Sequence, residues 1–287
     1  MFTFLGTSAG EQYPGVWCDC PNCHEARGLG GINIRRNSCA IVSDHTLIDF
    51  GPAIPVQLDQ QGFSLLKVQT LLVTHSHLDH FFPWYLRWRY YPEGVASPPE
   101  GDEMGPAFTK PLPLTVYGNS QVWDLLWQTV KGDLKGHHLD FVVLKPWEPV
   151  ATKHLVCTPV KANHDPTQEC FNFILEYQGK TILYATDTAA LLPETKDFLT
   201  GYRFDLVVME GTLGFNQQYD ATVSGHSNFQ LNRETRNWML GQNVLAETTP
   251  FVITHTGPHF APPHERCAPL LAKWGLTLAH DGMKIHL

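Results

Sequence analysis

Long hydrophobic runs are missing from this sequence of 287 residues, and its apolar stretches are too short to cross a membrane as helices. The first residues, Met-Phe-Thr-Phe-Leu-Gly-Thr, lack the basic and extended apolar regions of a signal peptide. Positive charge is also scarce, because 20 Lys and Arg face 28 Asp and Glu, for a net charge of −8. This balance disfavours a protein that binds nucleic acid through broad electrostatic attraction. A cytoplasmic protein is the prediction.

A disulfide scaffold is not expected either. The seven cysteines are odd in number, and a chain of this size can build its own core. Hydrophobic residues make up 43% and charged residues 17% of the chain, which is typical of a globular protein. Histidine is abundant by contrast: the chain has 15, about twice what an average usage of roughly 2% would give. Several histidines are grouped with carboxylates, as a metal site requires.

Short β-forming runs alternate with helical patterns along the chain. Strands are predicted at 2–7, 38–43, 46–50, 70–74, 114–117, 141–144, 155–160, 171–177, 181–186, 206–209 and 251–254. Helices are predicted at 53–61, 80–90, 121–131, 228–240 and 263–274. This order predicts an α/β protein with two packed sheets and helices outside, in a single domain over residues 1–287. The Pro/Gly-rich stretch 92–113 predicts an inserted loop of the kind that often covers a site.

A dense polar cluster follows the apolar run that ends at Thr74, and it contains His75, His77, Asp79 and His80. Alternation places His75 and His77 on one side of an extended backbone. Asp79 and His80 are expected to open the helix at 80–90. Imidazole and carboxylate groups this close together can surround two divalent ions such as zinc, manganese or iron. Satisfied polar residues at a strand end are the alternative, which suits a lone histidine better than this cluster.

The H-x-H-x-D-H pattern of this cluster resembles the signature of the metallo-β-lactamase superfamily. Members of that family have an αββα four-layer sandwich with a binuclear metal site at one edge. The remaining ligands of the family have counterparts here in the same order, each after an apolar run: His164, Asp187 and His255. The ligand set implied by the resemblance is His75, His77 and His164 for one ion, Asp79, His80 and His255 for the other, and Asp187 between them.

Two metal ions would activate a bridging water to a hydroxide nucleophile and offset charge on the substrate oxygens. Asp79 and Asp187 are therefore expected to be catalytic as well as metal ligands. His226 corresponds to a family position beside the metals, which implies a general acid or a phosphoryl hydrogen-bond donor. The alternative for His226 is a polar residue before a helix. Glu210, after the run 206–209, either orients a ligand histidine or is a solvated strand-end carboxylate.

A second group of metal-binding residues lies near the N-terminus, where Cys18, Cys20 and Cys23 form a C-x-C-x-x-C loop. Closely spaced thiolates suit a structural zinc ion with four ligands, but spacing alone leaves the fourth ligand open, and the adjacent His24 is sterically awkward. The loop resembles that of the PhnP-type phosphodiesterases of the carbon–phosphorus lyase pathway and of the PqqB-like proteins. The PhnP type implies His259 as the fourth ligand, although the spacing after His255 is one residue longer than in that type.

The complete H-x-H-x-D-H motif, which the PqqB-like branch lacks, favours hydrolysis. The predicted function is a metal-dependent phosphodiesterase for small or cyclic phosphodiesters, with two zinc or manganese ions, iron as an alternative, and one structural zinc. A nuclease of the same superfamily and a PqqB-like iron-dependent oxygenase or carrier remain alternatives. The expected partner is a small-molecule phosphodiester rather than nucleic acid or a membrane, and a homodimer is left open. The lone arginines Arg36, Arg87 and Arg89 are more often surface residues than phosphate ligands.

Overall fold

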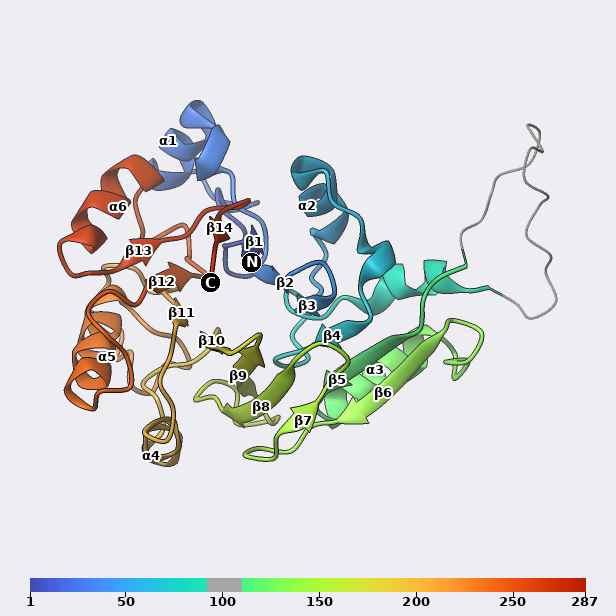
Figure 1. The fold of residues 1–287 in the computed structure, drawn as a ribbon. Coiled ribbons are helices and arrows are strands. Elements are labelled where there is room, and N and C mark those ends of the chain that lie inside the picture. The colour runs from blue at the N-terminus through green and yellow to red at the C-terminus, as the bar shows by residue number, and fades with distance from the viewer. Residues whose placement is uncertain (92–109) are drawn as a thin grey trace.

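Two sheets of seven strands each form the centre of the structure, a computed structural model that describes residues 1–91 and 110–287 (Figure 1). The strand order of the first sheet is β14 (Lys284–Ile285), β1 (Phe2–Gly6), β2 (Cys39–Val42), β3 (Thr46–Ile48), β4 (Thr70–Leu72), β5 (Leu114–Gly118) and β6 (Leu139–Val143). The second runs β13 (Thr277–Leu278), β12 (Phe251–Thr254), β11 (Leu206–Glu210), β10 (Lys180–Ala185), β9 (Phe171–Tyr177), β8 (Val156–Lys161) and β7 (Val150–Ala151). Because β1 pairs with β14, the two chain ends lie side by side.

Side-chain alternation along the strands builds three apolar layers. In β10, Ile182 and Tyr184 point into the core between the two sheets, whereas Leu183 and Ala185 point to the outer helices. Strand β2 does the same in the first sheet, with Ala40 in the inter-sheet core. Each sheet is therefore apolar on both faces and must be covered on its outer side.

Helices supply that cover on both outer faces (Figure 1). The first sheet packs against α2 (Ile54–Gln61), α3 (Ser120–Thr129) and the 3-10 helix η3 (Pro83–Arg89). The second sheet packs against α4 (Pro193–Leu199), α5 (Phe229–Gly241) and α6 (His264–Ala272). The remaining elements are α1 (Pro21–Leu29) and the 3-10 turns η1 (Gly31–Asn33) and η2 (Leu65–Lys67). This arrangement confirms the predicted αββα four-layer sandwich.

One predicted helix is wrong. The segment 80–90 does not begin an α-helix at Asp79 and His80; it forms the 3-10 helix η3 only from Pro83. The reason is a competing backbone pairing with the segment after β3. The amide of Phe50 donates to the His80 carbonyl, and the amide of Phe82 donates to the Phe50 carbonyl at 2.7 Å. These groups are therefore not available for helical hydrogen bonds.

Other differences concern short elements. The predictions missed α1, α4 and the two-residue strands β7, β13 and β14. The strands are too short to show a periodic pattern, and α1 buries only Cys23 and Ala26, so its apolar face is weak. Most of the loop predicted at 92–113 falls on residues 92–109, outside the described residues. No helix in the described part of the chain is long and apolar enough to span a membrane.

The inter-sheet core predicts a clear difference between buried and exposed strand positions. Replacing Leu175, which is fully buried between the sheets, with Ala should lower the free energy of unfolding by about 2–5 kcal/mol, because a cavity replaces packed methyl groups. Chemical denaturation checks this value. The matched control is Val143→Ala on the edge strand β6, where the side chain is 56% exposed and the loss should stay within about 0.5 kcal/mol. Equal losses in both variants would contradict the layer assignment.

Candidate metal centre

The candidate site lies at one edge of the sandwich, where the carboxyl ends of several strands meet. Strands β10, β11 and β12 are parallel, as are β3 and β4, so the residues that follow them emerge together. Asp49 after β3, Asp187 after β10 and His255 after β12 all have left-handed backbones, with φ of 62°, 50° and 49°. This region is sparsely populated for residues other than glycine and clusters at functional sites. The turn ends each strand and places its polar side chain at the edge.

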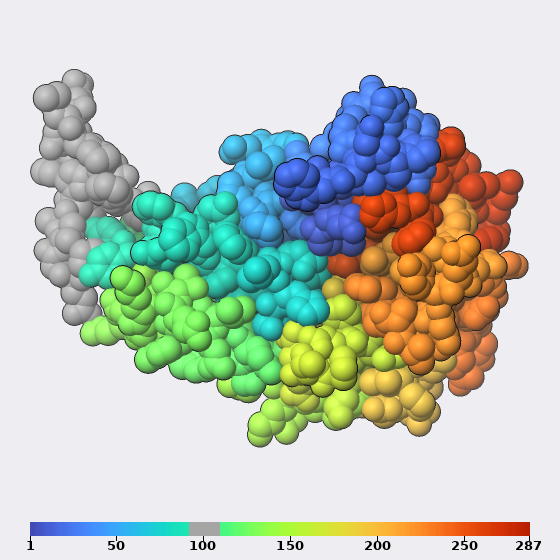
Figure 2. Space-filling view, turned by 180° about the vertical axis from the view of Figure 1, so that it is seen from behind, coloured from blue at the N-terminus to red at the C-terminus, as the bar shows by residue number. Residues whose placement is uncertain are grey.

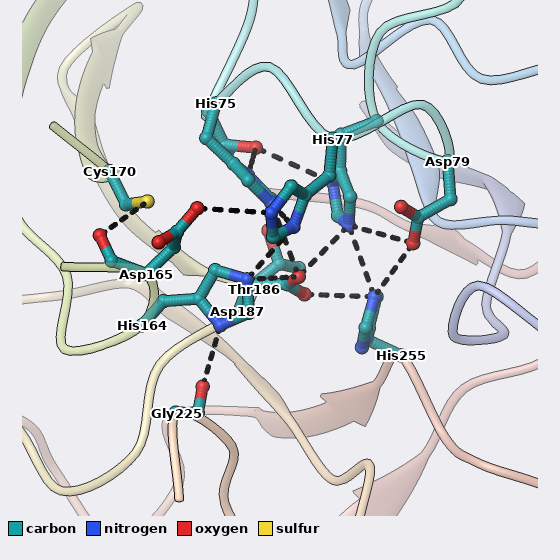
Figure 3. Close-up of polar contacts among 12 residues, drawn as sticks. His75, His77, Asp79, His164, Asp165, Cys170, Thr186, Asp187, Gly225 and His255 are labelled. Carbon is teal, nitrogen blue, oxygen red and sulfur yellow. Dashed lines mark hydrogen bonds and ion pairs between the residues drawn. The ribbon is translucent and has the colours of Figure 1, made fainter. Parts of the chain in front are cut away.

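Four side chains form a first donor group, made of His75, His77, His164 and Asp187 (Figure 3). The distance from His75 Nε2 to His77 Nδ1 is 2.9 Å, and that from His164 Nε2 to His77 Nδ1 is 3.1 Å. Asp187 Oδ2 lies 3.5 Å from His75 Nε2 and 3.4 Å from His164 Nε2. The structure therefore brings together, from β4, β8 and β10, the residues predicted for one metal ion.

A second donor group consists of Asp79, His80 and His255. His80 Nε2 lies 3.1 Å from His255 Nε2 and 3.4 Å from Asp79 Oδ2. Asp187 also contacts this group, through a 2.8 Å bond from its Oδ1 to His255 Nε2 and a 3.3 Å contact from its Oδ2 to His80 Nε2. Its carboxylate thus lies between the two groups (Figure 3).

The hydrogen bonds around the first group fit a metal ion. Burial lowers the pKa of His75 and of His164, so both rings are neutral at pH 7. The outer Nδ1 of His164 donates to the Gly225 carbonyl at 2.8 Å, and His77 Nε2 lies 3.2 Å from Asp165 Oδ2. The inner nitrogens of these rings therefore face one another with lone pairs. Lone pairs that face one another repel, but a cation bound between them makes the arrangement favourable.

In the second group, the pKa values of both histidines are raised where a metal ion would bind. Burial opposes protonation of His255, but the carboxylate of Asp187 outweighs it and raises the pKa of His255 to about 10. Burial likewise opposes protonation of His80, and Asp187 and Asp79 raise the pKa of His80 well above its ordinary value. A proton and a divalent cation are alternatives at these nitrogens, since a ligand histidine must be neutral. The donor chemistry of both groups thus suits divalent metal ions.

Carboxylates behind the rings hold them in place. Asp49 is fully buried and accepts hydrogen bonds from His80 Nδ1 at 2.8 Å and from the amide and hydroxyl of Thr74 at 2.9 and 3.0 Å. On the opposite side, Thr212 Oγ1 lies 2.8 Å from His255 Nδ1. Gly51 permits this packing, because a Cβ there would lie 2.2 Å from the Asp79 carbonyl oxygen.

His226 and Glu210 form a linked pair beside the donors. His226 Nδ1 donates to Glu210 Oε1 at 2.9 Å, and its ring centroid is 4.8 Å from that of His164. Glu210 is fully buried and also accepts from the amides of Thr188 and Thr212 at 3.0 and 2.9 Å. Burial opposes protonation of His226, but Glu210 raises the pKa of His226 above its ordinary value. The solvated alternative for Glu210 is therefore wrong, and the histidine that it orients is His226.

The cysteine loop lies close to His259: Cys18 Sγ is 3.5 Å from His259 Nδ1. Cys18, Cys20 and His259 form a group that could hold a metal ion. Burial opposes ionisation of Cys20, but the backbone amide of Cys23 and neighbouring side chains lower the pKa of Cys20 to about 7, which favours the thiolate. Cys23 is buried next to that group: its thiol interacts with those of Cys18 and Cys20, and its sulfur accepts from the Gly15 amide at 3.3 Å. His24 Nδ1 lies 3.5 Å from Asp19 Oδ1 within the loop, and His24 is not part of the group that Cys18, Cys20 and His259 form.

A cavity of about 380 Å³ opens over the donors. Its lining consists of Ala9, Gly10, Glu11, His77, Asp79, His164, Asp187, Thr212, His226, His255, Gly257, Pro258, His259 and Phe260. The N-terminal segment, blue in Figure 2, packs against the red C-terminal segment, so that Glu11 and His259 come to the same wall.

Sequence reasoning missed several of these residues. Asp49 and Thr212 carry the signal of a polar residue just after an apolar strand, but nothing local shows which ring they contact. Asp165 follows His164 directly and pairs with His77 from the other sheet.

The lone arginines lie outside the lining of the cavity. Arg36 donates to Gln12, Arg87 stacks on Trp84, and Arg89 contacts backbone carbonyls.

Comparison with known families agrees with this geometry. The family model of the metallo-β-lactamase superfamily matches residues 37–221, more than half of the chain. The chain belongs to this superfamily. The prediction from the H-x-H-x-D-H motif is thereby confirmed, and metal-dependent hydrolases are the enzymes expected of the family. No curated protein sequence matches the chain.

Solved structures of low sequence identity share the fold. A diphosphatase from the PhnP family is 19% identical with a TM-score of 0.73, covering 100% of this chain and 97% of that one. Zinc-bound PqqB from Methylobacterium extorquens is 18% identical with a TM-score of 0.71, covering 100% and 99%. The short form of human tRNase Z is 20% identical with a TM-score of 0.64, covering 99% and 98%. These likenesses extend the common fold beyond residues 37–221.

Proposed function

We propose that this superfamily member is a binuclear metal-dependent phosphodiesterase acting on small or cyclic phosphodiesters, like the PhnP-type phosphodiesterases that its motifs resemble. The observation that carries the proposal is the position of His226. Glu210 holds one ring nitrogen, and the ring lines the cavity beside His164 and His255. A proton donor is thus placed at the edge of the metal donors, where a leaving oxygen would depart.

In this proposal the two donor groups hold two divalent ions, zinc or manganese, with iron as the alternative. The bound ions supply Lewis acidity that activates water and offsets negative charge on the phosphoryl oxygens. Asp187 fits the bridging role because its Oδ2 contacts rings of both donor groups and its Oδ1 contacts His255. Asp49 and Asp165 orient the rings of His80 and His77, and burial also fixes the pair of Asp49 and His80.

Activity on a chromogenic diester tests this proposal. The purified protein with Mn²⁺ or Zn²⁺ should hydrolyse bis(p-nitrophenyl) phosphate, measured by release of p-nitrophenolate. Asp187→Ala should lower kcat/KM by at least about a hundredfold, because both donor groups lose a shared ligand. The control is Asp197→Ala on the exposed surface of α4, which should leave the rate unchanged.

A metal-loaded protein that cleaves no diester would contradict the proposal. Oxygen consumption with iron in that protein would favour the PqqB-like alternative, and cleavage of RNA in preference to small diesters would favour a nuclease. The acidic net charge of −8 argues against the nuclease. A cytoplasmic location and a homodimer stay predictions.

Diesters with different leaving groups can show whether His226 donates a proton or only supports the structure. His226→Ala should reduce kcat by about a hundredfold on a diester with an alkyl leaving group, because an alkoxide needs protonation as it departs. The same variant should lose much less on a p-nitrophenyl diester, whose leaving group is stable as an anion. Measuring both rates for each protein gives the comparison. An equal loss on the two substrates would show that His226 only supports the fold or the metal donors.

We also propose a structural zinc ion on Cys18, Cys20, Cys23 and His259, which would join the N-terminal loop to the segment that follows β12. Metal analysis of the purified protein should then find about three ions per chain, and Cys20→Ser should reduce this to about two. The buried thiol variant Cys157→Ser is the control, because Cys157 lies in the inter-sheet core, away from both groups. Three ions in the Cys20 variant would contradict this assignment.

A further inference from the structure

The side chain of Glu11 occupies a wall of the cavity over the donors. Its Oε2 accepts a hydrogen bond from His259 Nε2 at 2.7 Å, while Nδ1 of the same ring faces Cys18. The preceding Gly10 packs against Asp79, where an added Cβ would lie 3.2 Å from Asp79 Oδ2. Contacts on both sides therefore place the carboxylate of Glu11 beside the site, although its side chain is 59% exposed.

The ionic partner of Glu11 is the ring of His259. Among the described residues, the lining of the cavity contains no lysine or arginine, while Glu11, Asp79 and Asp187 are acidic. An adjoining cavity of about 600 Å³ shares His164 and contains one cation, Lys161. The same cavity contains Asp165 and Glu169, so it does not supply net positive charge either.

The acidic residues of the cavity affect which substrate groups can lie beside the scissile phosphate. Asp79 and Asp187 are the proposed metal ligands, so their charge would be offset by the ions. Among the described residues, the hydrogen-bond partner of Glu11 is the ring of His259, which would be neutral when bound to the proposed structural zinc. A second phosphate on the substrate would lie near Glu11, in a cavity whose described lining has no arginine or lysine. Like charges brought together without a counter-ion disfavour binding. A neutral polyol or a cationic amine meets no such repulsion.

We infer that Glu11 is a specificity-determining residue that restricts the enzyme to diesters whose flanking groups are neutral or cationic. The inference rests on the proposed function and narrows its substrate class. It separates simple diesters, in which the only negative charge is the scissile phosphate, from substrates that carry an additional phosphate. The cysteine loop takes part through His259, which positions the carboxylate that faces the substrate.

A matched pair of substrates tests this inference. Thymidine 5′-(p-nitrophenyl phosphate) and its 3′-phosphorylated form share the scissile bond and leaving group and differ by one phosphate. The metal-loaded protein should have a lower kcat/KM for the phosphorylated form. Glu11→Gln removes the charge but keeps an acceptor for His259, and it should raise the ratio of phosphorylated to unphosphorylated kcat/KM by about three- to tenfold. The difference between the two proteins should shrink as salt is added, because salt screens exposed charges.

The control is Glu148→Gln, which makes the same change of net charge at an exposed position outside both cavities and should leave the ratio as in the natural protein. An unaltered ratio in Glu11→Gln, or a preference of the natural protein for the phosphorylated form, would overturn the inference while leaving the phosphodiesterase proposal intact.

Binding provides a readout that does not depend on turnover. Calorimetry with thymidine 5′-monophosphate and thymidine 3′,5′-bisphosphate should show weaker binding of the bisphosphate, and Glu11→Gln should reduce that difference. If neither chromogenic diester is cleaved, the proposed function fails, and the binding comparison still decides the role of Glu11. Equal binding of both nucleotides by the natural protein would contradict the inference.

Discussion

The rest of the site depends on the contacts that the carboxylate of Asp187 makes with four histidine rings. Its Oδ1 lies 2.8 Å from His255 Nε2, and its Oδ2 lies 3.3 to 3.5 Å from the Nε2 atoms of His80, His164 and His75. These rings come from both sheets. A buried carboxylate needs positive charge nearby, since an unpaired charge inside a protein is costly, and protonated His80 and His255 or bound divalent ions can supply it. The edge of the sandwich is therefore arranged around one anion and the rings that face it.

A layer of polar residues behind the rings keeps them in position. Asp49 and Glu210 are fully buried, and each accepts backbone amide hydrogen bonds in addition to one ring nitrogen. Their own orientations are thus fixed by the backbone. A site built on strand ends in this way needs little rearrangement to accept metal ions or substrate. In the same way, the ring of His259 holds the carboxylate of Glu11 in the wall of the cavity.

Prediction from sequence succeeded where a pattern was local. Alternating apolar runs located the central strands, and the spacing of His75, His77, Asp79 and His80 identified the superfamily. It failed where distant backbone decided the outcome. The helix expected at 80–90 is displaced because Phe50, from another strand end, takes its first hydrogen-bonding groups. Asp49 was missed for a related reason, since its contact with His80 spans 31 residues of sequence.

By itself the sequence determined the strands, the four-layer arrangement and the residues that could bind metal, because side-chain periodicity and ligand type are properties of short segments. Only the tertiary structure decided how those residues combine. It paired Glu210 with His226 rather than with solvent, and it brought His259 rather than His24 to the thiols of Cys18 and Cys20. It also brought Glu11 to the cavity wall. The physical reason is that these contacts form where strand ends and chain termini converge, and their hydrogen bonds and charges depend on that convergence.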